Sequence, residues 1–184
     1  MNRNTVKSLT FSVLLLVSGA SIISTNARTS ANTLVADGQS SRTVVRVAQS
    51  NNVDTTTIEQ SIINKINQYR ASRGLSVLSR NTSIDSQSKK HSQEMAKGKA
   101  PFGHDGFKER VQATGLAYSG GAAENVAFNM GFGDPATKAV EGWLKSPQHR
   151  QNIEGKYDET GIGVAVNHKG EVFFTQIFIS SSQQ

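Results

Sequence analysis

Three separated segments of this chain each offer one ionisable side chain among small or apolar neighbours. His104 stands in FGHDGF, Glu124 in AENVA and His149 in WLKSPQHRQNI. Imidazole and carboxylate are the groups that bind metals or move protons near neutral pH. Three of them on one small domain mark a candidate site, provided that the fold brings their segments together.

The first predicted helix opens the globular part of the chain. Thr57 and Gln60 have the spacing of a capping box, in which two side chains satisfy the free amides of a helix start. Isoleucines follow at helical spacing up to Ile66, and Gly74 ends the pattern. A helix is therefore predicted from Thr57 to just before Gly74.

Three further helices are predicted from their periodicity and their ends. The pattern gives helices over about 82–97 and 106–114. Asp134 followed by Pro135 is typical of a helix N-terminus, because aspartate caps free amides and proline fits the first turn. Pro147 lies just past the end of this last helix.

The final third of the chain changes to the alternation of β-strands. Ile162, Val164 and Val166 alternate with small residues, a turn follows at 167–170, and a strand apolar on both faces spans 171–179. Residues 118–121 read as a glycine-rich loop. A strand buried on both faces needs a layer on each side. The prediction is an α+β fold, a three-layer α-β-α sandwich around a small antiparallel sheet.

The N-terminal part of the chain has the composition of a targeting segment and a linker. Residues 1–27 combine a basic start, an apolar run at 11–17 and small polar residues, as in a secretory signal peptide. An uncleaved anchor is disfavoured because 19–26 is too polar to complete the roughly 18 apolar residues of a span. Residues 28–56 read as a flexible linker, which leaves 57–184 as the domain. We expect a secreted or cell-envelope protein.

The composition bounds the class of protein further. The chain lacks cysteine, so an exported domain must be held together by packing alone, a style typical of bacteria. From Thr57 onward it carries 15 Lys and Arg against 12 Asp and Glu, scattered and not interleaved with aromatic residues. This distribution disfavours a nucleic-acid partner. Nucleotide binding is also disfavoured, because the sequence has no glycine-rich loop of the kind that binds phosphate. The Ser86-x-x-Lys89 match to penicillin-recognising enzymes is attributed to chance, because their other motifs are absent.

Taken as a set, six segments resemble the bacterial CAP domains, whose superfamily includes cysteine-rich secretory proteins, antigen 5 and plant pathogenesis-related proteins. The segments, in chain order, are HSQEMA at 91–96, His104, ENVA at 124–127, the tryptophan and SPQHR…NI at 143–153, GIGV at 161–164 and TQIF at 175–178. The resemblance covers roughly residues 57–180. Its specificity lies in the order of the set, since each segment alone is weak.

This resemblance implies an α-β-α sandwich with a cleft lined by two histidines and one or two glutamates. By position the histidines are His104 and His149 and the glutamate is Glu124, although Ala123 stands where the family motif has glycine. The family's second glutamate falls about one turn after the tryptophan, where this chain has Ser146.

Glu141 is the nearest acid but does not take over that role. It precedes Trp143 by two residues, so at about 100° per residue it should project from the other side of the helix into water. The expected cleft is therefore His-Glu-His.

Two functions from different classes follow from the resemblance. The first is a monomeric extracellular binding module for a lipid, cell-wall or protein ligand. The second is a hydrolase that uses a divalent cation such as Zn²⁺ held by His104, Glu124 and His149, with the fourth tetrahedral position open for water. Structural roles stay open as well, because Glu124 can accept hydrogen bonds from loop amides and His149 can orient the turn around it. His91 reads as a satisfied core-edge residue and His168 as an exposed turn residue.

Overall fold

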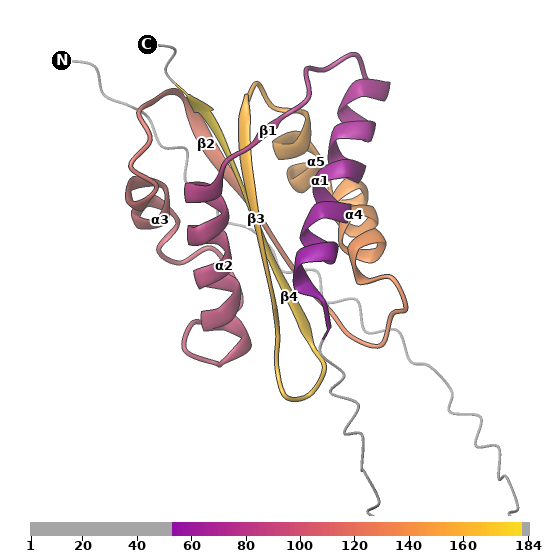
Figure 1. The fold of residues 1–184 in the computed structure, drawn as a ribbon. Coiled ribbons are helices and arrows are strands. Elements are labelled where there is room, and N and C mark those ends of the chain that lie inside the picture. Colours follow the sequence, from indigo (N-terminus) through magenta and orange to yellow (C-terminus); the bar gives the residue numbers. More distant parts are fainter. Residues whose placement is uncertain (1–52, 182–184) are drawn as a thin grey trace, which may run out of the picture. The chain divides into compact units, whose positions relative to one another are not determined.

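A four-stranded sheet forms the middle layer of the domain, in the strand order β1-β3-β4-β2 (Figure 1). The computed structural model describes residues 53–181; the predicted signal peptide and most of the predicted linker lie outside the described residues. The elements are α1 (Thr55–Ser72), β1 (Ser79–Arg80), α2 (Thr82–Ala96), α3 (Phe107–Ala113), β2 (Tyr118–Asn129), α4 (Pro135–Lys145), α5 (Pro147–Glu154), β3 (Glu159–Val166) and β4 (Val172–Ser181).

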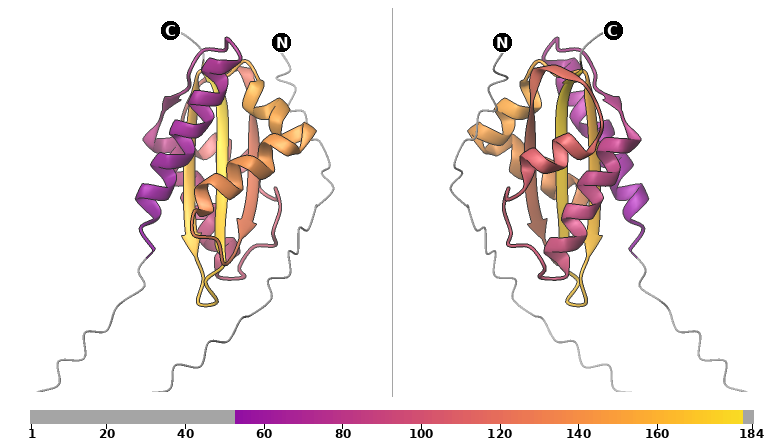
Figure 2. Two further views of the ribbon diagram at one scale, coloured as in Figure 1. Left: turned by 90° about the vertical axis from the view of Figure 1, so that its right-hand side faces the viewer. Right: turned by 90° about the vertical axis from the view of Figure 1, so that its left-hand side faces the viewer.

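The helices cover both faces of this sheet. Helices α1, α4 and α5 lie on one face, and α2 and α3 lie on the other (Figures 1 and 2). Strand β4 is buried along most of its length, as its two apolar faces predict. The three-layer α-β-α sandwich is therefore confirmed. None of the helices within residues 53–181 has the length and apolar character needed to cross a membrane.

The sheet differs from the prediction in two details. Strands β3, β4 and β2 pair antiparallel, but β1 joins the edge of β3 in parallel, so the sheet is mixed. Residues 118–121, predicted as a loop, begin β2, with a register irregularity between Tyr118 and Ala122. Glycine pairs disguise the strand start, because they remove the side chains on which a period-two pattern depends.

The helix ends also correct the prediction. Helix α1 starts at Thr55, and the cap is Asp54, whose Oδ1 accepts from the backbone N–H groups of Thr56 and Thr57. The capping box at Thr57 was wrong: the Gln60 side chain donates to Asn64 instead of turning back. The Asp134 cap of α4 is confirmed, since its carboxylate accepts from the Thr137 N–H.

A fifth described helix, α5, was missed in the sequence. Pro147 follows the end of α4, as predicted, and also occupies the first turn of α5. Its fixed φ and missing N–H suit that position as well as they suit a helix stop. The distinction matters for the site, because α5 carries His149.

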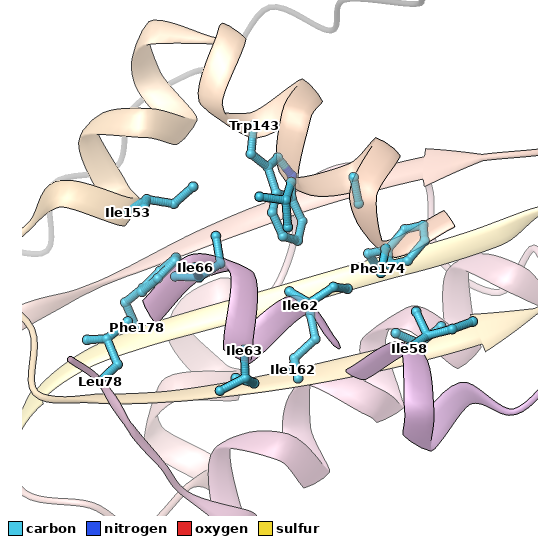
Figure 3. Packing of buried hydrophobic residues seen from close by; sticks show 14 of the residues in the cluster. Ile58, Ile62, Ile63, Ile66, Leu78, Trp143, Ile153, Ile162, Phe174 and Phe178 are labelled. Atoms are coloured by element: carbon cyan, nitrogen blue, oxygen red, sulfur yellow. The ribbon is translucent and has the colours of Figure 1, made fainter. Parts of the chain in front are cut away.

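The main core lies between the sheet and the α1-α4-α5 layer (Figure 3). Ile62 and Ile66 of α1, Trp143 of α4, and Phe174 and Phe178 of β4 are almost fully buried there. Burial of such side chains contributes about 1.5–3 kcal/mol each. This packing fixes α4 and α5 against β2.

On the other face, α2 approaches β3 with no space for a side chain. A Cβ on Gly163 would lie 2.0 Å from the backbone nitrogen of Lys89, and one on Gly161 would lie 2.3 Å from that of Asp85. The Ser88 hydroxyl donates to the Gly161 carbonyl across this contact. The two glycines therefore set the distance between α2 and the sheet.

Candidate functional site

A buried carboxylate stands at the centre of the candidate site. The Glu124 side chain, on β2, is 1% exposed, and both of its oxygens are hydrogen bonded. Arg110 donates from Nε to Oε2 at 2.9 Å and from a terminal nitrogen to Oε1 at 2.8 Å. His104 Nδ1 lies 2.9 Å from Oε1. Two of the three predicted residues are therefore in direct contact.

Arg110 is the site residue that the sequence reading missed. Its guanidinium also donates to the backbone carbonyls of His104 and Asp105, so it holds the loop that carries the imidazole. A usable pattern was present: Phe107, Arg110 and Val111 share one face of α3, the face that packs inward. A carboxylate buried in a strand requires such a cation.

His149 is carried by the helical layer on the other face of the sheet. It lies in α5, and Asn125 of β2 donates from its side chain to the His149 backbone carbonyl at 3.1 Å. Asn152, one helical turn later, donates to the Glu124 carbonyl at 3.2 Å and to the Asn125 side-chain oxygen at 2.9 Å. These amide contacts dock α5 on the strand that carries Glu124.

Two influences lower the pKa of His149. Burial, the larger cause, and the positive charge that His104 can carry together lower the pKa of His149 to about 4. At neutral pH the His149 ring is therefore uncharged. We call His104, Arg110, Glu124 and His149 the imidazole cluster.

The carboxylate of the predicted metal site is already paired with a cation. Within residues 53–181, no group of three or more His, Cys, Asp or Glu side chains is disposed to hold a metal ion. The Glu124 carboxylate is paired with the Arg110 guanidinium through two hydrogen bonds. A metal ion at Glu124 would have to displace a fixed cation.

The structural role that the sequence left open for Glu124 is observed only in part. Glu124 does accept hydrogen bonds, but from Arg110 and His104 side chains and not from the loop amides that were considered. Glu141 is exposed and pairs with Lys138 at 3.6 Å, as its position on the helix predicts.

His91 contacts the loop that carries His104. Its ring is 1% exposed, its Nε2 lies 2.9 Å from the Gly103 carbonyl next to His104, and burial lowers its pKa. Its Nδ1 has no hydrogen-bond partner among the described residues, so the prediction of a fully satisfied core-edge histidine holds for one nitrogen only. His168 is exposed in the β3–β4 turn, as predicted.

A shallow hollow lies elsewhere, on the polar face of α1. None of the predicted site residues contributes to it; the lining residues are Thr57, Gln60, Ser61, Asn64, Lys65 and Gln68.

Comparisons with solved structures give the same fold. An extracellular protein containing an SCP domain from Bacillus anthracis is 26% identical, with a TM-score of 0.59 over 69% of this chain and 41% of that chain. An outer surface protein of Borrelia burgdorferi aligns at 15% identity, with a TM-score of 0.60 over 71% and 97% of the two chains. A cysteine-rich secretory protein of Staphylococcus aureus aligns at 21% identity and a TM-score of 0.57, over 71% and 40%.

This chain thus spans less than half the length of the Bacillus and Staphylococcus proteins. The comparison with curated proteins finds no match. The profile of the Cysteine-rich secretory protein family, named CAP, matches residues 63–178, which is more than half of the chain. The fold, the order of the motifs and this match together show that the chain belongs to the CAP family.

Proposed function

We propose that this protein is an extracellular binding module that holds a polar group of its ligand at the imidazole cluster. The observation that carries the proposal is the engagement of both Glu124 oxygens by Arg110 and His104. With the carboxylate neutralised, the other titratable groups of the cluster are two imidazoles, one of which is uncharged at neutral pH. Imidazole nitrogens donate to or accept from hydroxyl, carboxylate and phosphate groups.

The extracellular part of the proposal is supported by two separate features. The N-terminal sequence has the composition of a signal peptide. Two of the structural neighbours are described as extracellular or outer-surface proteins. The ligand is accordingly sought in the cell envelope, among its wall, lipid and protein components.

A binding experiment with variants of the two histidines tests this function. Wild-type protein is incubated with purified cell wall, with phospholipid vesicles and with extracellular protein, and the bound fraction is measured by sedimentation or retention. We expect one component to be bound several-fold less well by the double variant His104→Gln, His149→Gln, while the exposed control Glu141→Gln binds as wild type does. Binding to none of the three, or binding that ignores both histidines, would refute the proposal.

The metal-dependent hydrolase is separated from the binding module by isothermal titration with Zn²⁺ near neutral pH. The binding module predicts no saturable uptake by the wild-type protein. Saturable binding that His149→Ala abolishes would instead favour the hydrolase. Arg110→Gln is an informative partner variant, because removal of the competing cation releases the carboxylate and should raise any residual Zn²⁺ affinity.

A further inference from the structure

His91 is a buried titratable residue that the proposed function does not use. It lies in α2 and is 1% exposed. Its Nε2 lies 2.9 Å from the Gly103 carbonyl oxygen, so Nε2 carries the proton and donates it, since a carbonyl can only accept. Burial, the largest influence, lowers the pKa of His91, so the ring is neutral near neutral pH. The one donor of the neutral ring is therefore committed to the loop that carries His104.

The other ring nitrogen of His91 indicates a role beyond packing. Nδ1 accepts no hydrogen bond from any of the described residues. A buried polar atom without a partner costs free energy, and an apolar side chain of similar volume would avoid that cost. The imidazole is thus a poor choice for filling space alone. What an apolar side chain would not supply at this position is the donor to Gly103.

Side-chain donors hold three consecutive carbonyls of the loop. The carbonyls of His104 and Asp105 accept from the Arg110 guanidinium of α3, at 3.4 and 2.6 Å. The preceding carbonyl, that of Gly103, accepts from His91 of α2. The loop is therefore held from two different helices, and His91 supplies the contact on the N-terminal side of His104.

Helix α2 is a fixed element from which to hold the loop. Its backbone approaches β3 at Gly161 and Gly163 with no space for a side chain. The hydroxyls of Ser88 and Ser92 lie 3.3 and 2.9 Å from the carbonyl oxygens of these two glycines. A side chain on an element packed so closely holds its partner more precisely than a side chain on a loop.

We propose that His91 is a positioning residue of the imidazole cluster, which fixes the His104 ring against Glu124 through the Gly103 carbonyl. His104 follows Gly103 directly, and its Nδ1 lies 2.9 Å from Oε1 of Glu124. A functional side chain on a loop needs such support to keep its place within about 0.5 Å. The inference deepens the proposed function and rests on it for the effect on binding, whereas the position of the His104 ring is measured without any ligand.

NMR of the full chain without ligand tests the positioning. In wild type, the Nε2–H proton of His91 and the Nδ1–H proton of His104 should exchange slowly with water, because each is donated to a protein oxygen. His91→Leu removes the donor and keeps an apolar side chain in its place. In this variant the His104 proton should exchange about fivefold or more faster, the change expected when one hydrogen bond is lost. The backbone order parameters of residues 103–105 should fall from about 0.85 toward 0.6.

Two further variants separate positioning from stability. His91→Gln, whose amide nitrogen can take the place of Nε2, should largely restore the slow exchange and the order parameters. Ser92→Ala is the matched control, because Ser92 is the next residue of α2, is fully buried and contacts β3 instead of the loop. It should lower the melting temperature, as His91→Leu does, but leave residues 103–105 as they are in wild type.

Three NMR results would overturn the inference. The first is a wild-type His91 that carries its proton on Nδ1, a result that needs no variant and so decides the question even if His91→Leu does not fold. The second is a His91→Leu protein in which residues 103–105 stay as ordered as in wild type. The third is a Ser92→Ala protein in which these residues become equally mobile.

The binding assay of the proposed function gives the second arm of the test. His91→Leu should bind the envelope component several-fold less well, whereas His91→Gln and Ser92→Ala should bind nearly as wild type does. Wild-type binding by His91→Leu with a mobile loop would overturn the role of His91 in the site. If wild-type protein binds none of the components, the proposed function fails, while the NMR results still decide whether His91 positions His104.

Discussion

At the scale of single residues, Glu124 decides what the site can be. Its carboxylate is buried and shared between a guanidinium and an imidazole, so it fixes the positions of Arg110 and His104 and also limits its own reactivity. A buried charge of this kind is stable only with its partners in place. The same contacts that build the site therefore also stabilise the domain.

Substitution of Glu124 by glutamine measures how much these contacts contribute to the free energy of unfolding. The amide retains the shape but loses the charge and turns a donor toward other donors, so the free energy of unfolding should fall by about 1–3 kcal/mol. Denaturant unfolding checks the value, with Glu141→Gln as the exposed control, expected within about 0.5 kcal/mol of wild type. An unchanged unfolding free energy would mean that the pair with Arg110 contributes nothing.

His149 predicts a dependence of stability on pH. Its pKa is about 4 in the fold, below the ordinary value of 6.5, so the unfolded chain binds the proton more readily. The stability that the neutral His149 ring contributes is complete above about pH 6.5 and is lost as the pH falls toward 4. The expected loss is about 1–3 kcal/mol, a reduced value because the ring is partly exposed to solvent. The loss of unfolding free energy between pH 7 and pH 4.5 should be smaller in His149→Gln than in wild type. The contribution of His91 is common to both proteins and cancels in this comparison. Equal losses in the two proteins would contradict the prediction.

At the scale of elements, the position of α5 is the step on which the site depends. Arg70 of α1, which is 2% exposed, donates to the carbonyls of Ile153 and Gly155 at the end of α5 and to Ser76. Asn152 and Trp143 donate to the Glu124 and Val126 carbonyls of β2, an edge strand of the sheet. These contacts fix α4 and α5 against the strand that carries Glu124.

Replacement of Arg70 by methionine should therefore loosen α5. The methionine fills part of the space but leaves several buried carbonyls without a donor, so we expect a loss of about 2–4 kcal/mol in unfolding free energy. Arg73→Met is the matched control, because Arg73 is 62% exposed and meets Glu154 only at 3.9 Å. Equal effects of the two substitutions on chemical denaturation would show that the carbonyl contacts carry no weight.

The contact between α2 and β3 gives a second prediction at this scale. Gly163→Ala places a Cβ against the Lys89 backbone, so about 3 kcal/mol or more of stability should be lost. Gly142→Ala, in α4 with nothing within 4 Å of the new Cβ, should stabilise the protein by up to about 1 kcal/mol. Thermal melts compare the two alanines, and a tolerated Gly163→Ala would show that the two layers can move apart.

The elements differ in how far the sequence predicted them. Helices α2 and α4 followed from the period of one apolar face and from their ends, and strands β3 and β4 followed from alternation and from apolar residues on both faces. Helix α5 escaped because a proline either ends or begins a helix, and β1 escaped because two residues show no period. Arg110 was missed because a partner for Glu124 depends on where α3 packs, which is a property of the whole fold.

At the scale of the molecule, the candidate site exists only in the assembled sandwich. His104 precedes α3 on one face of the sheet, His149 lies in α5 on the other, and β2 carries Glu124 between them. The bacterial CAP resemblance gave this set of residues by position, and the contact between His104 and Glu124 agrees with it. The three layers must therefore be correctly packed before all three segments take up these positions.

The most direct test of this account is an NMR titration of the histidine rings between about pH 3 and pH 8, across the ordinary range of imidazole. The account predicts that His149 titrates at about 4 and that His104→Gln raises this pKa, because a neighbouring positive charge is removed. A His149 that titrates near 6.5 and does not respond to His104→Gln would contradict the convergence of the two rings, and with it the imidazole cluster.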